Sequence, residues 1–171
     1  MQSMQTAGSI GAVQVNSLTE NEMKDKFLTF EVEKDEYGVE IQYVVDIIGM
    51  QKITEVPGLP DYLKGIVNLR GKVFPVMDVR TRFRKEPMEY NDRTCIIVID
   101  MRDTTVGLIV DTVLEVLDIP EGSIVEPPDM CSENQNKYIS GIGKVGQRVK
   151  LLLDCNRLFT DGEVLPLAEF A

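Results

Sequence analysis

The stretch YLKGIVNLRGKVFPVMDVRTRF, residues 62–83, decides the fold. It predicts a strand over 64–69, a tight turn at Arg70-Gly71 and a second strand over 72–77. A short helix follows, and Asp78 opens it, because a carboxylate at this place accepts hydrogen bonds from the first helical N–H groups. The stretch is therefore expected to be a β-hairpin that leads directly into a helical turn.

Alternation assigns a role to each face of this hairpin. Side chains two apart on a strand point the same way, so Val67 and Leu69 face a core while Asn68 and Arg70 share the opposite face. Gly71 suits a turn position with positive φ. Pro75 donates no ladder hydrogen bond and is expected at a sheet edge or a bulge. The outer face thus presents a polar pair beside the turn.

The rest of the chain reads as further short strands. A hairpin over 27–42 turns at Lys34-Asp35-Glu36, and the apolar run 44–48 fits either a helical turn or a strand. A strand over 53–56 precedes the Pro57-Gly58-Leu59-Pro60 loop. Later predictions are strands at 94–101, 105–110, 113–117, 138–145 and 148–153, a loop over 118–137 and a short helix over 154–159.

The second half of the chain repeats the first. Gly38, Ile41, Val44 and Asp46 recur 69 residues later as Gly107, Val110, Val113 and Glu115, and Tyr62, Gly65, Ile66, Asp78 and Phe83 recur 76 residues later as Tyr138, Gly141, Ile142, Asp154 and Phe159. Each copy holds about five strands and a short helix, a size at which a sheet closes into a small barrel. The sequence predicts a mainly β protein of two similar barrels with a groove between them.

The repeat also sets the expected domain boundaries. Residues 1–25 lack aromatic side chains and are expected to form a disordered arm. One domain follows over 26–162, with a first repeat over about 26–85 and a second over about 86–160. Residues 163–171 form a tail.

Composition excludes several classes of function. Eighteen basic and 28 acidic residues give a net charge of −10, which disfavours nucleic acid as a partner. Histidine is absent, so the commonest general base and zinc ligand are missing. Cys95, Cys131 and Cys155 form no CxxC pair and are expected to be thiols, the first and third of them buried. With no apolar run long enough to span a membrane, a cytosolic protein is expected.

Two interpretations of the polar pair remain open. Arg70 beside Asn68 could bind a carboxylate or a helix surface of a partner, since a guanidinium offers a planar fork of donors. Alternatively, Arg70 pairs internally with Asp46 or Asp78 and only holds the turn. Val44 and Asp46 likewise fit either a binding groove or ordinary core packing. The second copy has Lys144 and Gly146 in place of Asn68 and Arg70, so only the first copy carries this site.

Several motifs resemble the CheW-like family of bacterial chemotaxis coupling proteins. They are Tyr37-Gly38-Val39-Glu40-Ile41, Gly65-Ile66-Val67-Asn68-Leu69-Arg70-Gly71, Pro75-Val76-Met77-Asp78-Val79-Arg80, Tyr90-Asn91-Asp92-Arg93-Thr94 and Tyr138-Ile139-Ser140-Gly141-Ile142-Gly143. The resemblance covers about residues 26–160, and Asn-Leu-Arg-Gly is its most specific segment.

The resemblance implies two five-stranded SH3-like barrels and an adaptor without catalysis or cofactor. Such a protein bridges the cytoplasmic tips of methyl-accepting chemotaxis receptors to the regulatory domain of the histidine kinase CheA, and it is recruited from the cytoplasm to receptor clusters without entering the membrane. By position, the implied receptor-binding residues are Val44, Asp46, Asn68, Arg70, Val113 and Val116, with Gly65 and Gly71 as structural turn residues. No kinase-binding residue is implied.

Two rival functions stay open on the residues alone. One is a small-barrel protein that binds a ligand or metal through clustered carboxylates such as Asp35-Glu36, or Asp100 with Asp103, although no metal-ligand spacing accompanies them. The other is an SH3-like domain for proline-rich peptides, which the absence of tryptophan disfavours.

Overall fold

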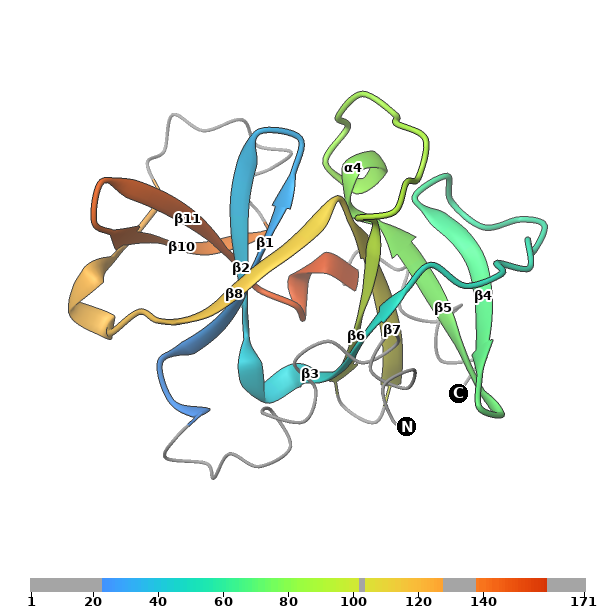
Figure 1. Ribbon diagram of the computed structural model, residues 1–171, viewed down its shortest axis with the longest axis horizontal. Coiled ribbons are helices and arrows are strands. Elements are labelled where there is room, and N and C mark those ends of the chain that lie inside the picture. Colours follow the sequence, from blue (N-terminus) through green and yellow to red (C-terminus); the bar gives the residue numbers. More distant parts are fainter. Residues whose placement is uncertain (1–22, 102–103, 128–137, 160–171) are drawn as a thin grey trace.

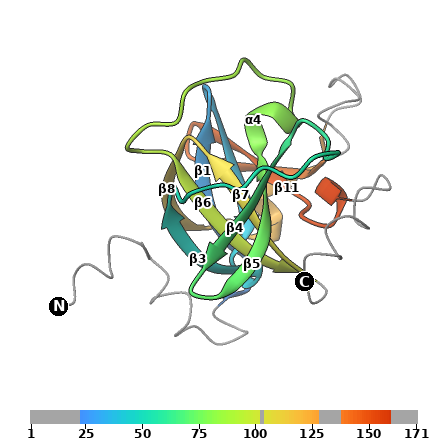
Figure 2. The same cartoon turned by 90° about the vertical axis from the view of Figure 1, so that its right-hand side faces the viewer.

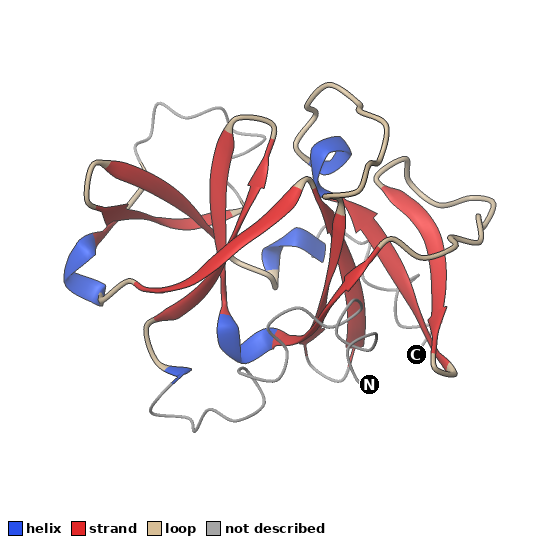
Figure 3. Cartoon of the chain, in the orientation of Figure 1, coloured by secondary structure: helices blue, strands red, loops and turns tan. Residues whose placement is uncertain are grey.

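The computed structural model describes residues 23–101, 104–127 and 138–159, and strands dominate it (Figures 1 and 3). In chain order the elements are β1 (Lys26–Val32), β2 (Asp35–Glu40), η1 (Ile41–Tyr43), β3 (Val44–Gly49), β4 (Leu63–Leu69), β5 (Lys72–Asp78), α4 (Val79–Arg82), β6 (Cys95–Met101), β7 (Thr104–Val110), β8 (Thr112–Asp118), η2 (Glu121–Ser123), β9 (Ile124–Val125), β10 (Ile139–Val145), β11 (Arg148–Leu153) and η3 (Arg157–Phe159). The predicted mainly β fold is confirmed.

The strands form two small barrels side by side (Figure 1). Barrel A has the strand order β8-β1-β2-β11-β10-β9, where β9 contributes only two residues. Barrel B has the order β3-β6-β7-β5-β4. The expectation that each repeat closes its own barrel is wrong, because each barrel combines strands from both halves of the chain.

A parallel strand pair joins the two halves in each barrel. In barrel B, Val76 of β5 pairs with Gly107 of β7. In barrel A, Leu152 of β11 pairs with Gly38 of β2. These two pairs are equivalent under the 69- and 76-residue repeat, so the internal duplication is visible in the backbone pairing. The exchange of strands makes the two barrels one interlocked unit.

The hairpin of residues 62–83 forms as predicted. β4 and β5 are antiparallel and meet at a turn in which Arg70 has φ +53° and Gly71 has φ +86°. Asp78 Oδ1 accepts hydrogen bonds from the backbone N–H groups of Arg80 (2.9 Å) and Thr81 (3.4 Å), which caps α4. Sequence alone therefore located both the turn and the helix cap.

Pro75 is the exception in this hairpin. It lies in β5, an interior strand of barrel B, rather than at an edge. It pairs with Ile66 on one side, while the parallel pairing with β7 begins only at the next residue, Val76. A proline fits here because no ladder partner on the β7 side requires its missing N–H.

Other local predictions need correction. No strand forms over 53–56, where a single bridge joins Thr54 to Ile66. The run 44–48, for which a helical turn and a strand were both open, is the strand β3. The loop over 118–137 contains η2 and β9, and the helix expected over 154–159 is reduced to the 3-10 turn η3. The C-terminal tail, Cys131 and most of the N-terminal arm lie outside the described residues.

Three hydrophobic clusters fill the molecule. The largest lies between the barrels and includes a chain of aromatic rings, Phe30, Tyr37, Phe83 and Tyr138, with successive centroids 5.7, 5.4 and 5.6 Å apart. Two smaller clusters lie within barrel B and barrel A. Cys95 and Cys155 are buried thiols, as expected.

Gly65 is the glycine with the strictest backbone requirement. Its φ is +145°, and a Cβ at this place would lie 2.2 Å from the backbone oxygen of Thr54. We expect Gly65→Ala to lower the free energy of unfolding by about 2–4 kcal/mol, because neither backbone can move away without breaking the bridge between Thr54 and Ile66. Urea denaturation measures this change.

Gly49→Ala is the matched control for this prediction. Nothing lies within 4 Å of a Cβ at Gly49, which is also in a strand of barrel B. We expect its stability to change by less than about 1 kcal/mol. Equal losses in the two variants would show that the close approach at Thr54 does not govern position 65.

Candidate protein-binding surface

A tight turn joins β4 to β5 (Figure 2). It holds an exposed arginine in an unusual backbone conformation. Arg70 lies in the left-handed region, and 66% of its side chain is exposed. Asn68 Oδ1 accepts a hydrogen bond from the Gly71 backbone N–H at 3.1 Å, so the Asn68 amide stabilises the turn from inside. The turn is thus locally fixed, while the guanidinium points into solvent.

Asp46 reaches this turn from the other edge of barrel B. It lies on β3 directly after a register shift between Val44 and Asp46. Its Oδ1 accepts from the Ile47 backbone N–H at 2.8 Å, and its Oδ2 lies 3.7 Å from Arg70 Nη1. The pair bridges β3 and β4, the two outer strands of the sheet.

This geometry answers the question left open by the sequence. Arg70 does have an internal partner, Asp46, but an ion pair at 3.7 Å with one exposed member contributes about 0–1 kcal/mol. Asp78 is engaged elsewhere, by the α4 cap and by the Tyr90 hydroxyl at 2.7 Å. The loose pair orients the guanidinium and leaves most of it accessible to another molecule.

The predicted valines fall into different environments. Val44 is only 3% exposed and belongs to the central core, which favours the core-packing alternative for it. Its neighbour Val45 is 37% exposed. Sequence reasoning missed Val45, because the register shift in β3 displaces the simple alternation.

The second copy places its apolar side chains on β8 of barrel A. Val113 is half-buried against the central core, whereas Val116 is 39% exposed. Leu114, which the sequence analysis also missed, is equally exposed and corresponds to Val45 by the 69-residue repeat. Equivalent positions in the two copies therefore both present an apolar side chain to solvent.

The polar half of the surface exists in one copy only. Gly146 replaces Arg70 and keeps the left-handed backbone, with φ +63°. Glu115 replaces Asp46, and its backbone is held by Thr29, whose hydroxyl donates to the Glu115 carbonyl at 2.6 Å. The second turn has the same backbone without a guanidinium, as the sequence indicated.

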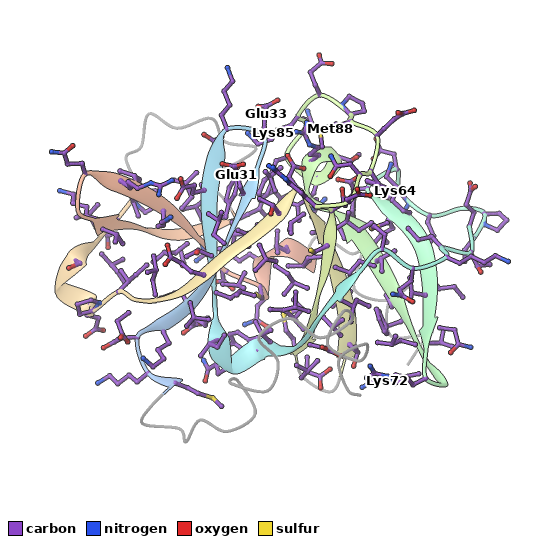
Figure 4. The ribbon with its side chains drawn as sticks, in the orientation of Figure 1. Glu31, Glu33, Lys64, Lys72, Lys85 and Met88 are labelled. Atoms are coloured by element: carbon purple, nitrogen blue, oxygen red, sulfur yellow. The ribbon has the colours of Figure 1, made fainter. Side chains whose placement is uncertain are left out.

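A second polar cluster, which the sequence analysis did not identify, lies where the β1–β2 turn meets α4. Figure 4 shows Glu33 and Lys85 together there, with Met88 nearby. Arg80 donates to both carboxylate oxygens of Asp111 at 2.8 and 2.7 Å, and the Glu33 backbone N–H donates to the same carboxylate at 2.7 Å. Lys85 Nζ lies 2.7 Å from Asp35. These contacts connect the two barrels at their surface.

Asp111 is the most strongly engaged carboxylate of this cluster. Burial by itself raises the pKa of Asp111, but the hydrogen bonds from Arg80 and from the Glu33 amide outweigh burial and hold the pKa below its ordinary value. The carboxylate therefore stays ionised and bonded in the folded chain at neutral pH.

The carboxylates suggested as a catalytic or metal site are used otherwise. Asp35 pairs with Lys85, and Glu36 pairs with Lys150 and Arg148. Asp100 accepts from the Thr105 hydroxyl, and Asp103 lies outside the described residues. Among the described residues no group of three acidic, Cys or His side chains is placed to hold a metal ion.

The two described cysteine thiols are buried and unreactive. Burial raises the pKa of the Cys155 thiol to about 12, and burial also raises that of Cys95, so neither is a reactive thiolate at neutral pH. No described helix is long and apolar enough to cross a membrane.

Comparison with known proteins identifies a matching family and similar chains. A family model described as the CheW-like domain matches residues 26–163. The chemotaxis protein CheW of Klebsiella aerogenes is 31% identical over 90% of this chain and 93% of its own length, and that of Bacillus subtilis is 36% identical over 77% and 85%. The crystal structure of the scaffolding protein TtCheW from Thermoanaerobacter tengcongensis superimposes with a TM-score of 0.74 at 32% identity, covering 81% of this chain and 94% of that one.

Asp111→Asn should weaken the fold and change how acid affects it. We expect a loss of about 1–3 kcal/mol in the free energy of unfolding at pH 7, the range for hydrogen bonds to charged groups. Because the folded-state pKa of Asp111 lies below its unfolded value of about 3.9, the contribution of this carboxylate is full above that value and is lost as the pH falls through the folded pKa.

The asparagine variant has no ionisable side chain at position 111. Its stability should therefore fall less steeply than that of the parent chain as the pH drops below about 4. Chemical denaturation at several pH values between 7 and 3 measures both curves. Parallel curves over this range would contradict the assigned role of Asp111.

Proposed function

The chain belongs to the CheW-like domain family of chemotaxis scaffold proteins, and on this basis we propose that it joins chemoreceptors to the histidine kinase CheA without catalysing a reaction. It acts in the cytoplasm and is recruited to receptor clusters at the membrane. It needs no cofactor for this role. Its role is to hold the receptor and the kinase in fixed positions relative to each other.

The main support for the receptor-binding part is the backbone at Arg70. A side chain in the left-handed region costs about 1–2 kcal/mol relative to glycine, and the second copy uses glycine at the same place. The internal contact of Arg70 is a long ion pair with Asp46, too weak to offset this cost. Positive φ alone marks no contact, since Arg84 has it too. Arg70 differs in that Asp46 on the opposite edge strand orients its exposed guanidinium, which favours a contact with another molecule.

The proposed receptor surface combines this polar turn with exposed apolar side chains. Asp46, Asn68 and Arg70 supply the polar part, and Val113 and Val116 on β8 supply an apolar part. Val45 and Leu114 extend the apolar part, while Val44 supports β3 from the core. A receptor helix with apolar side chains and an acidic residue opposite Arg70 would suit such a surface.

The kinase would use a different face. The kinase regulatory domain has the same fold within the family, so we propose barrel-to-barrel packing between the two proteins. No residue of this chain is assigned to that contact. A ligand- or metal-binding function through clustered carboxylates is not favoured, because Asp35 and Glu36 already have basic partners.

Arg70→Ala tests the receptor contact. We expect receptor-fragment affinity to fall by about 1–3 kcal/mol, or roughly 5- to 150-fold in Kd, as for an arginine at the centre of an interface. Arg70→Gly, which copies the second repeat, should lose the same affinity while its stability stays within about 1 kcal/mol of the parent chain. Isothermal titration calorimetry and urea denaturation measure the two quantities.

Arg84→Ala is the matched control for Arg70. Arg84 is also an exposed arginine with positive φ (+58°), but it follows α4 and lies outside the proposed surface. Its substitution should leave receptor affinity unchanged, and none of these variants should alter CheA binding. Unchanged receptor affinity in both Arg70 variants would exclude this turn as the contact.

Val116→Ser tests the apolar part on the other barrel. We expect a three- to tenfold weaker receptor affinity, equivalent to about 0.7–1.4 kcal/mol for a partly buried valine at an interface. Val149→Ser is the control, because Val149 is an exposed valine on β11 of the same barrel. Equal effects of the two substitutions in calorimetry would indicate that β8 has no special part in binding.

A further inference from the structure

Each repeat ends in a short helical turn. α4 follows β5 of barrel B, and η3 follows β11 of barrel A (Figure 1). Asp78 Oδ1 caps α4, and Asp154 Oδ1 accepts hydrogen bonds from the backbone N–H groups of Asn156 (3.0 Å) and Arg157 (3.4 Å) in the same way. The two turns are therefore equivalent in their capping as well as in the 76-residue repeat.

The two turns touch each other at equivalent residues. Arg82 ends α4, and the repeat places Leu158 of η3 at the same position 76 residues later. Arg82 Nη2 donates a hydrogen bond to the backbone oxygen of Leu158 at 2.8 Å, and Leu158 is buried in the central cluster. The strand exchange between the repeats is reciprocal, so a contact between equivalent residues lies close to the axis that relates the two barrels.

The same guanidinium is stacked between two equivalent tyrosine rings. Arg82 Cζ lies 4.1 Å from the ring centroid of Tyr62, which precedes β4 of barrel B, and 4.7 Å from that of Tyr138, which precedes β10 of barrel A. The backbone oxygen of each tyrosine accepts a hydrogen bond from its own repeat, from the N–H group of Asp78 (2.8 Å) or of Asp154 (2.9 Å). One planar cation thus contacts both barrels through matching rings, an arrangement to which a guanidinium is suited.

These contacts of Arg82 are directional, unlike most of the contacts around them. The central cluster between the barrels consists of apolar and aromatic side chains, and burial of apolar area is non-directional. Such burial holds the barrels together but specifies their relative angle weakly. A hydrogen bond requires alignment, and a stacked guanidinium keeps a fixed plane. Arg80 and Lys85 connect the barrels at the surface, whereas Arg82 does so from within.

Tyr62 contributes to this arrangement through its ring and not through its hydroxyl group. The residue is 7% exposed, and its buried hydroxyl has no hydrogen-bond partner among the described residues. Phenylalanine would keep the aromatic face under the guanidinium and remove the unsatisfied hydroxyl. The substitution Tyr62→Phe therefore leaves the stacked arrangement in place.

We propose that Arg82 is a positioning residue, which fixes the angle between the two barrels and thereby aligns the two parts of the receptor surface. The inference rests on the proposed function, in which the Asp46–Arg70 pair of barrel B and β8 of barrel A bind one receptor. Because these parts belong to different barrels, a change in the angle moves one relative to the other. Arg82 then acts on receptor binding without belonging to the binding surface.

Residual dipolar couplings of the ¹⁵N-labelled full chain measure the angle without any receptor. In the parent chain, one alignment tensor should fit the backbone N–H groups of both barrels. In Arg82→Leu, which introduces the residue of the second repeat, the tensors fitted to barrel A and barrel B should differ in orientation or magnitude, while each barrel still fits its own internal structure. A single common tensor in this variant would overturn the proposal.

A second substitution decides the question if Arg82→Leu does not fold. Arg82→Lys keeps the positive charge and loses the planar fork of donors. We expect its two tensors to differ in the same sense, by a smaller amount. A common tensor in the folded lysine variant would show that charge alone is sufficient and that the stacked, hydrogen-bonded guanidinium does not set the angle.

Two controls separate the angle from general stability. Ile97→Val removes one methylene from the central cluster and should lower the midpoint of urea unfolding. Tyr62→Phe keeps the ring beneath the guanidinium. Both variants should retain the common tensor and the receptor affinity of the parent chain. Tensors that diverge in Ile97→Val as much as in Arg82→Leu would show that any loss of core packing changes the angle, which contradicts a specific role for Arg82.

Calorimetry with the receptor fragment tests the alignment. Arg82→Leu should weaken receptor binding about three- to tenfold, because the two parts of the surface no longer fit one ligand together. If the angle changes and receptor affinity does not, the alignment role is wrong. Unchanged affinity in Arg70→Ala would instead exclude the proposed receptor surface, and the dipolar couplings would still decide whether Arg82 sets the angle.

Discussion

The parallel pairing of β7 with β5, and of β2 with β11, is the constraint on which the rest of the structure depends. These parallel pairs join strands from opposite halves of the chain at Gly107 and Gly38. A Cβ at Gly107 would lie 2.7 Å from the Ile96 side chain and 2.9 Å from the Val76 side chain, so any side chain there would collide with the packed side chains of the neighbouring strands. A glycine at the same place in each repeat lets each barrel combine strands from both halves of the chain.

The exchange of strands makes the two repeats dependent on each other for burial. The central cluster draws on strands from both halves, and Arg82 lies between the rings of Tyr62 and Tyr138, 4.1 and 4.7 Å from their centroids. Those two tyrosines are equivalent in the repeat. Neither half could bury its apolar face alone, so the molecule is expected to unfold as one cooperative unit.

The sequence predicted features that depend on nearby residues and failed where distant contacts decide. The β4–β5 hairpin and the Asp78 cap are local patterns, and both predictions were correct. The pairing between repeats was missed, because parallel partners lie far apart in the chain and carry no local signal. Val45 was missed for a different reason. It lies at the register shift in β3, where Val44 is buried and Val45 is exposed, and the alternating pattern alone does not say which of these two valines faces the core. The ion pair between Arg80 and Asp111 joins residues 31 apart in the sequence, so no local sequence pattern predicts it.

The differences between the copies follow from what the shared backbone permits. At the hairpin turn the backbone requires positive φ in both copies, and glycine adopts it without strain, so the arginine of the first copy is the change that costs free energy. Inside the barrels the same plan requires apolar filling, so the buried Lys150 of barrel A, which stands where barrel B has Phe74, is the costly change there. In each case one copy retains the residue that the fold prefers and the other has a charged side chain in its place. A duplicated scaffold can accept such departures because the copy that remains regular, together with the core between the barrels, supplies the stability that the altered site gives up.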